Sequence, residues 1–227
     1  MKPTFTASAR RCVLTIFAIA TAASAEVEWK NIFNGENLDG WDGDPRLWYV
    51  EDGVLVGETD DDERHIARNS FLIWEGGEPG DFELEFKARI TTPNNSGVQF
   101  RSQRMDGDGW RVTGYQYDLH PRPSYNAMLF EEGGRGIMCE RGQHVRMTPG
   151  KEVVGEFELV DADLAEWQTY RLVAKGHRFE HYVNGELQAL IEDEDEENRA
   201  DDGIIALQLH QGPAMKVEFK DMRIRNF

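Results

Sequence analysis

Apolar and polar residues alternate along most of the chain, and Gly, Pro, Asn or Asp interrupts the alternation at short intervals. The clearest case is Phe-Glu-Leu-Glu-Phe-Lys-Ala-Arg-Ile at 82–90, which is typical of a strand with one wet face. Asn184-Gly185 lies between two such runs, 178–183 and 186–191, and predicts a hairpin with a type I′ turn. The same reasoning predicts further strands at 47–50, 53–57, 71–74, 97–102, 115–119, 127–131, 169–175, 204–209 and 215–224.

No long stretch has the period of a helix, and any helix is limited to one or two short turns near 162–166. A series of short strands without repeat or linker indicates one all-β domain, a β-sandwich or jelly roll.

The N-terminus has a different character from the rest. Lys2, Arg10 and Arg11 precede an apolar run at 12–23 that ends in Ala23-Ser24-Ala25. This order is typical of a signal peptide, and the run is short for a bilayer span. We therefore expect a signal peptide at 1–25, a mature domain at 26–227 without a membrane span, and a periplasmic or extracellular location.

Composition excludes several classes of function. The 227 residues carry a formal charge of −17, which disfavours binding to nucleic acid or to anionic membrane surfaces. Two cysteines exclude a disulfide framework, and Cys139 is expected to be a small buried side chain. The acidic runs at 60–63 and 192–197 are expected to be solvated loops, with Ca²⁺ binding as the alternative.

Candidate chemistry follows from strand parity, because alternate side chains of a strand point to opposite faces. Four predicted strands then offer polar side chains on the face turned away from the core, at strand centres or ends. If these faces converge, they line a concave sheet with a cation, two carboxylates, an imidazole and amides. The set is Arg101, Gln116, Asp118, Glu131, Gln208 and His210.

Each of these residues could also be an ordinary solvent-facing sheet residue. Their number favours a site, and paired Arg, Asp and Gln side chains suit sugar hydroxyls. Other chemistries lack their motifs, since the chain has no phosphate loop, G-x-S-x-G elbow or H-E-x-x-H.

Several motifs together resemble the 3-keto-disaccharide hydrolase domain family. They are Phe33-Asn34-Gly35-Glu36-Asn37-Leu38-Asp39-Gly40-Trp41, Asn95-Ser96-Gly97-Val98-Gln99-Phe100-Arg101, Gly114-Tyr115-Gln116-Tyr117-Asp118 and Ile205-Ala206-Leu207-Gln208-Leu209-His210-Gln211-Gly212. The resemblance covers nearly all of 29–227. It implies a concanavalin A-like jelly-roll sandwich that is exported and acts on oxidised carbohydrates.

The resemblance places Arg101, Gln116, Asp118, Glu131 and His210 at a concave site, the set that parity also selects. We expect Gln116, Gln208, Gln99 and Asn95 to bind the substrate.

The expected reaction is removal of the acidic C2 proton of a 3-keto-glycoside, loss of the C1 substituent and addition of water. His210 or Asp118 is the expected base, Glu131 the acid and Arg101 the clamp for the enolate or a hydroxyl. A divalent cation such as Ca²⁺ could replace Arg101, and an oxidoreductase could supply the 3-keto sugar.

Two alternatives remain open. One is a non-catalytic carbohydrate-binding module, because sandwiches also serve as lectins. The other is an ordinary two-carboxylate glycosidase, although the chain lacks the E-x-D-x-x-E motif of sandwich glucanases.

Overall fold

The computed structural model describes residue 1 and residues 28–107 and 109–227. The predicted signal peptide therefore lies, apart from Met1, outside the described residues. Every helix or strand element in the described part of the chain is a β-strand, and none of its segments is a helix long and apolar enough to cross a membrane.

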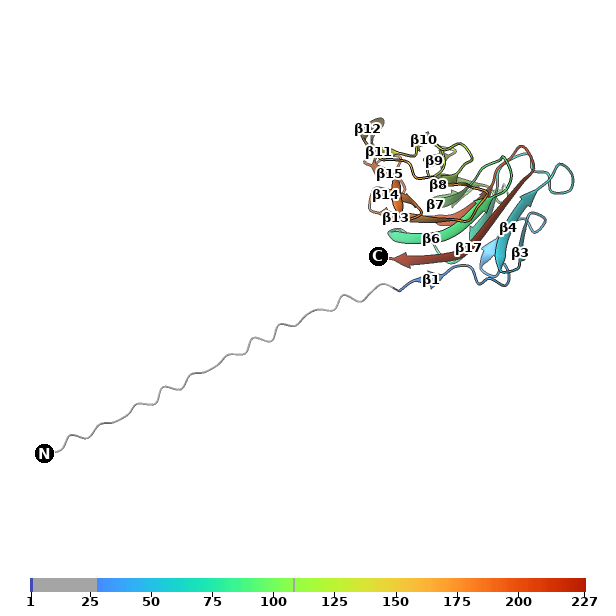
Figure 1. The fold of residues 1–227 in the computed structure, drawn as a ribbon, viewed down its shortest axis with the longest axis horizontal. Coiled ribbons are helices and arrows are strands. Elements are labelled where there is room, and N and C mark those ends of the chain that lie inside the picture. Colours follow the sequence, from blue (N-terminus) through green and yellow to red (C-terminus); the bar gives the residue numbers. More distant parts are fainter. Residues whose placement is uncertain (2–27, 108) are drawn as a thin grey trace.

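The strands form two sheets that pack face to face (Figure 1). The ten-stranded sheet has the order β12 (Gly150–Glu156), β11 (Gln143–Thr148), β15 (Glu186–Asp193), β14 (Arg178–Val183), β13 (Gln168–Lys175), β6 (Phe82–Ile90), β17 (Met215–Asn226), β4 (Val54–Thr59) and β3 (Trp48–Glu51), with β1 (Lys30–Asn31) beside β17. The seven-stranded sheet has the order β10 (Gly136–Cys139), β9 (Leu129–Glu132), β8 (Val112–Leu119), β7 (Ser96–Arg104), β16 (Ile204–Leu209), β5 (Ser70–Trp74) and β2 (Trp41–Asp42).

Alternation in the sequence produces the core between the sheets. Phe86 of β6 lies 6.1 Å from the ring of Tyr117 in β8, and Phe100 of β7 lies 5.2 Å from that of Phe179 in β14. Such edge-to-face pairs join the two layers and add to the burial of apolar area. Cys139 is buried in the same core, as expected.

The predicted strands are present, several with the predicted bounds. The turns at Asp52-Gly53 and Asn184-Gly185 have positive φ at both residues, as a type I′ turn requires. Five strands, β1, β2, β10, β11 and β12, were not predicted, and 162–166 forms a turn and a bend rather than a helix.

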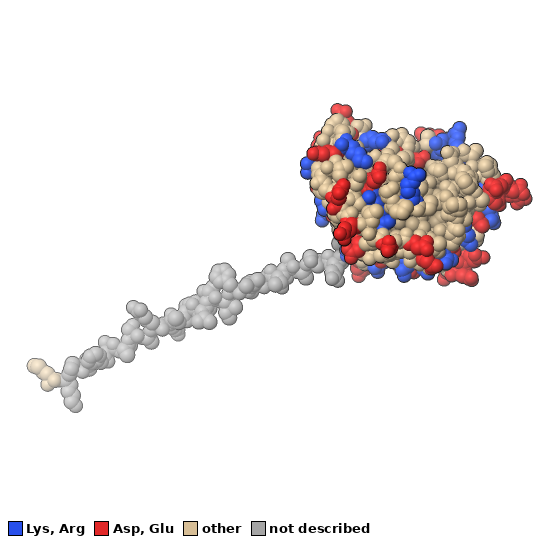
Figure 2. Space-filling view, turned by 45° about the horizontal axis from the view of Figure 1, so that its top comes forward, with Lys and Arg blue, Asp and Glu red and all other residues tan. Residues whose placement is uncertain are grey.

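Charge is distributed over the surface rather than gathered. On the face shown in Figure 2, acidic and basic side chains are interspersed and form no extended basic patch. The predicted polar residues come from β7, β8, β9 and β16, which all belong to the seven-stranded sheet, so its outer face is where they can meet.

Candidate active site

A cavity of about 340 Å³ opens on the outer face of the seven-stranded sheet. Its volume falls within the range of small-molecule sites, about 300–1,000 Å³. Strands β8, β9, β10 and β16 contribute to it, together with residues before β5 and β7 and the 120–128 loop. The lining consists of Asn69, Asn95, Gln116, Asp118, His120, Tyr125, Met128, Phe130, Glu132, Ile137, Gln208 and His210. We refer to this cavity as the pocket.

Strand alternation explains why the polar side chains face the pocket. In β8, Tyr115 and Tyr117 point into the core, so Gln116 and Asp118 point to the opposite face. Likewise, the core position of Leu207 directs Gln208 outward. The structure thus brings Gln116, Asp118, Gln208 and His210 together, as the sequence predicted, with Asn95 at their edge.

A chain of hydrogen bonds fixes the carboxylate. Ser102 Oγ donates to Gln99 Oε1 at 2.7 Å, and Gln99 Nε2 donates to Gln116 Oε1 at 2.8 Å. Gln116 Nε2 then donates to Asp118 Oδ1 at 2.7 Å. Gln99 is therefore a support behind the lining rather than part of it.

Glycine at position 97 makes room for this arrangement. A Cβ atom there would come within 2.6 Å of Gln116 Cγ, closer than packed atoms approach. The glycine of the Asn95-Ser96-Gly97 motif is thus explained by the close packing of β7 against Gln116.

Asp118 has the environment of a general base. Its side chain is almost wholly buried, and burial is the main reason that the pKa of Asp118 is raised to about 7. The negative charge of Glu132 raises this pKa further, whereas the hydrogen bond from Gln116 lowers it. A carboxylate with a pKa near neutrality can accept a proton and return it.

Glu132 is the second carboxylate of the pocket. Asn69 Nδ2 donates to its two oxygens at 3.3 and 3.4 Å. Burial raises the pKa of Glu132 above its ordinary value, although Asn69, His210 and Arg111 act in the opposite direction. The carboxyl group is thus suited to carry a proton.

The two histidines of the pocket present different ring atoms. The Nδ1 atom of His120 accepts from the backbone N–H of Arg122 at 2.9 Å, so its proton is on Nε2. The Nδ1 atom of His210 faces the carbonyl oxygen of Gln211 at 2.6 Å and must donate, which leaves a lone pair on Nε2 of the neutral ring. Burial lowers the pKa of His120, which keeps it a neutral donor.

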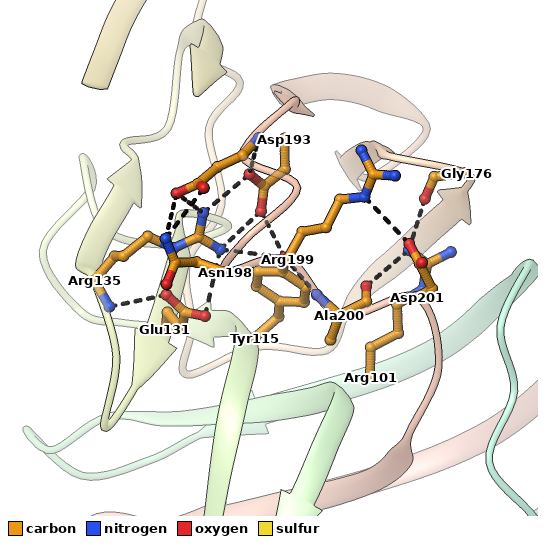
Figure 3. Close-up of polar contacts among 11 residues, drawn as sticks. Arg101, Tyr115, Glu131, Arg135, Gly176, Asp193, Asn198, Arg199, Ala200 and Asp201 are labelled. Carbon is orange, nitrogen blue, oxygen red and sulfur yellow. Dashed lines mark hydrogen bonds and ion pairs between the residues drawn. The ribbon is translucent and has the colours of Figure 1, made fainter. Parts of the chain in front are cut away.

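The placement predicted for Arg101 is wrong. Arg101 has a φ of +44° at a β-bulge of β7, so the alternation breaks and the side chain leaves the pocket face. Its buried guanidinium donates to the carbonyl oxygens of Gly176 and Ala200 at 2.6 and 3.2 Å (Figure 3). It also donates to the carbonyl oxygen of Gly80 at 2.8 Å. Arg101 therefore joins three loops and is not available as a clamp in the pocket.

The placement predicted for Glu131 is also wrong. Because Leu129 points into the core, alternation in β9 places Glu131 on that side and Glu132 in the pocket. Glu131 Oε2 accepts from Arg135 Nε at 2.6 Å, and Arg135 Nη2 donates to Asp193 Oδ2 at 2.7 Å (Figure 3). We call Glu131, Arg135, Asp193 and Asp195 the Arg135 cluster.

This cluster also corrects the expectation for the acidic run at 192–197. Asp193 is 0% and Asp195 5% exposed, so two of its carboxylates are structural rather than solvated. A hollow of about 580 Å³ beside the cluster is larger than the pocket. Its buried cation, Arg101, is already held by backbone carbonyls, so we place the chemistry in the pocket.

Sequence reasoning missed four residues of the lining that carry polar groups. Glu132 could have been found by continuing the alternation from Leu129. Tyr125 and His120 belong to a loop, and Asn69 precedes β5, so strand parity carries no signal for them. Among the described side chains, no group of three or more His, Cys, Asp or Glu residues is arranged to hold a metal ion.

Comparisons with known proteins identify the family and the fold. A family model described as a 3-keto-alpha-glucoside-1,2-lyase-like domain matches residues 28–225. No curated protein matches the chain.

Solved structures share the fold. A candidate glycosyl hydrolase from Parabacteroides distasonis has a TM-score of 0.62 at 17% identity, covering 88% of this chain and 100% of its own. A second candidate glycosyl hydrolase from the same organism has a TM-score of 0.59 at 21% identity, and the match covers 89% of this chain and 95% of that one. Carbohydrate binding module CBM66 from Bacillus subtilis has a TM-score of 0.56 at 17% identity, and the match covers 82% of this chain and 96% of that one. These likenesses confirm the predicted concanavalin A-like jelly-roll sandwich.

Proposed function

Since the chain belongs to the family of 3-keto-alpha-glucoside-1,2-lyase-like domains, a carbohydrate-active family, we propose that it cleaves 3-keto-glycosides or 3-keto-disaccharides in the pocket. The observation that carries the proposal is Asp118, a buried carboxylate whose pKa is raised to about 7 at the floor of a cavity of sugar-binding size. A base of this strength suits a C–H proton that a neighbouring ketone has made acidic.

The first step is an elimination. Asp118 removes the proton from C2, and the electron pair delocalises onto the C3 oxygen as an enolate. The Nε2–H of His120 and the amide of Gln208 are the donors in the pocket that can stabilise this oxygen. The enolate collapses to a C1–C2 double bond as the C1–O bond breaks, and Glu132 protonates the departing oxygen.

The second step is a hydration. Water adds its oxygen to C1 of the enone, and the lone pair on His210 Nε2 accepts the proton that the water loses. Asp118 returns its proton to C2. The products are a 3-keto sugar and the free alcohol, and the histidine proton passes to the Glu132 carboxylate or to solvent, which closes the proton balance.

We further propose that the protein works outside the cytoplasm after removal of residues 1–25, and that a separate oxidoreductase produces its substrate. The first part follows from the leader-like sequence at the N-terminus. The second follows from chemistry, because the C2 proton of an unoxidised sugar is not acidic and an oxidation at C3 must come first.

The test uses purified protein with 3-keto-glucosides and their unoxidised parents, each with and without a chelator. We expect turnover of the 3-keto compounds alone, and transient absorbance of the enone when hydration is slower than elimination. Turnover that the chelator abolishes would assign the electrophile to a metal ion instead of His120 and Gln208.

A carbohydrate-binding module is the rival function, since CBM66 has the same fold. It predicts calorimetric binding of unoxidised sugars and no turnover of any 3-keto-glycoside, a result that would overturn our proposal. Hydrolysis of unoxidised nitrophenyl glycosides would instead indicate an ordinary glycosidase.

A further inference from the structure

The outer face of the seven-stranded sheet changes from polar to apolar across the pocket. The register pairs Gln99 with Gln116, Gln116 with Phe130, and Phe130 with Ile137. Paired residues of neighbouring strands lie side by side on one face of a sheet. The row therefore runs from two amides at the sheet centre to two apolar side chains at the edge strand β10.

The apolar side chains at this edge are not part of the core. Their strand neighbours Leu129 and Met138 belong to the main core cluster, whereas Phe130 and Ile137 point to the opposite face and belong to neither core cluster of the described residues. Ile137 is 37% exposed, one of six large apolar side chains that the described residues expose. Folding alone gives no reason for an isoleucine at this position.

Two further side chains complete the surface. Met128 and Tyr125 of the 120–128 loop line the pocket with them, and we call Tyr125, Met128, Phe130 and Ile137 the apolar wall. The wall adjoins Asp118 and Gln116, which lie on the strand next to Phe130. A substrate with its sugar over the amides therefore directs its C1 substituent either along the wall or out to solvent.

We propose that the apolar wall is the leaving-group subsite, and that it selects 3-keto-glycosides of apolar, ring-bearing alcohols over 3-keto-disaccharides. This inference rests on the proposed function. A second sugar would bring hydroxyls to a surface whose only hydrogen-bonding side-chain group is the Tyr125 hydroxyl. A hydrocarbon ring would instead bury apolar area against all four side chains.

The apolar wall is held firmly enough to discriminate between leaving groups. Arg135 lies in the β9–β10 turn, and its backbone N–H donates to Glu131 Oε2 at 2.8 Å while its guanidinium holds Asp193. The hairpin that presents Phe130 and Ile137 is thus anchored from behind. A preformed apolar surface gains more from a complementary ligand than a surface that must first become ordered.

The experiment compares three 3-keto-glucosides that differ in the leaving group: benzyl alcohol, methanol and glucose. Benzyl alcohol and methanol are of similar acidity, so their intrinsic leaving abilities match and the ratio of kcat/KM reports the subsite. We expect the benzyl compound to exceed the methyl and glucosyl compounds about tenfold to hundredfold, the worth of burying one aromatic ring. Equal values for the three compounds would overturn the inference and leave the proposed function intact.

Variants locate the effect. Ile137→Ser and Phe130→Leu should each reduce the benzyl-to-methyl ratio toward one. Val154→Ser is the matched control, because Val154 on β12 is 38% exposed, close to the 37% of Ile137, but does not line the pocket. An unchanged ratio in Ile137→Ser and Phe130→Leu, whose folding is checked by thermal melts, would contradict the assignment.

A binding measurement separates the two proposals. Unoxidised benzyl and methyl glucosides are titrated calorimetrically into wild type and Ile137→Ser. Tighter binding of the benzyl compound, lost in the variant, supports the wall even if no 3-keto compound is turned over, a result that would count against the proposed function alone. Equal binding of both glucosides to wild type would contradict the wall.

Discussion

Glu131 and Glu132 are consecutive residues of β9 with opposite surroundings. Glu131 is held by the guanidinium of Arg135 in a cluster with two buried aspartates, whereas Glu132 accepts hydrogen bonds from the amide of Asn69. The pKa of Glu132 is raised by burial, and that of Asp118 is raised to about 7. The difference teaches that the carboxylates paired with Arg135 hold the structure, whereas the carboxylates of the pocket have raised pKa values and suit the proton transfers that we propose.

Asp118→Asn should have the largest effect on the pocket side of this comparison. Loss of the base should lower kcat/KM for a 3-keto-glucoside by about 10²–10⁴-fold, and the wild-type rate should rise with pH through about 7 as Asp118 ionises. The pH–rate profile of both proteins checks this. A wild-type profile flat between pH 5 and 9 would contradict the role of Asp118.

The same variant should gain stability. A carboxyl whose folded pKa lies above its unfolded value binds more protons when folded, so its contribution to stability falls as pH rises from about 4 to 7. Asn carries no such penalty, and the variant should therefore unfold at a higher temperature than wild type above pH 7. A lower melting temperature at pH 8 would show that the ionised carboxylate is well compensated.

Arg135→Ala should have the largest effect on the cluster side. It leaves the fully buried Asp193 without its guanidinium, and breaking such a pair costs about 3–5 kcal/mol of the free energy of unfolding. Urea denaturation measures the loss. Arg178→Ala is the control, because this exposed arginine pairs with Glu180 and Glu192 at the surface and should cost about 1 kcal/mol or less.

The two adjacent glutamates test the comparison directly. Glu132→Gln should lower kcat/KM about 10²-fold with little change in stability. Glu131→Gln should lower stability by about 1–3 kcal/mol, because it weakens buried hydrogen bonds to Arg135, and leave the rate per folded molecule unchanged. Equal loss of rate in both variants would remove the distinction between pocket and cluster.

The last prediction concerns His181, which lies in the core and affects stability only at acid pH. Its Nδ1–H donates to the carbonyl oxygen of Ala127 at 3.0 Å, and its ring stacks on Tyr117. Burial lowers the pKa of His181 to about 4 from 6.5, so the unfolded chain binds the extra proton and stability falls as pH drops through this window. The slope should reach about 1.4 kcal/mol per pH unit and should be smaller in His181→Phe, as urea denaturation at a series of pH values would show.

The sequence predicted most of the sandwich because burial imposes alternation on its central strands. It missed β12, whose residues are nearly all exposed and therefore show no alternation of burial. The fold could be predicted from the alternation of apolar and polar residues in strands such as β6. The same alternation predicted that Gln116 and Asp118 share the pocket face.

The site was predicted only as far as alternation holds. Arg101 lies at a bulge with positive φ, and no feature of its own sequence marks that break. Asp193 lies within an acidic run, and the composition of that run indicates a solvated loop. In the structure Asp193 is buried and forms an ion pair with Arg135. The roles of both residues depend on contacts with distant segments, which a local pattern does not contain.

Because side chains alternate along β9, the length of this strand decides which glutamate faces the pocket. One residue added to β9 before Glu131 would exchange the faces of the two glutamates. Glu132, the proton carrier that we propose, would turn to the side of Arg135, and Glu131 would turn to the pocket. Such a change would remove activity and weaken the hairpin at once. Length variation among functional relatives should therefore spare β9 and accumulate in exposed turns such as the one at 106–107.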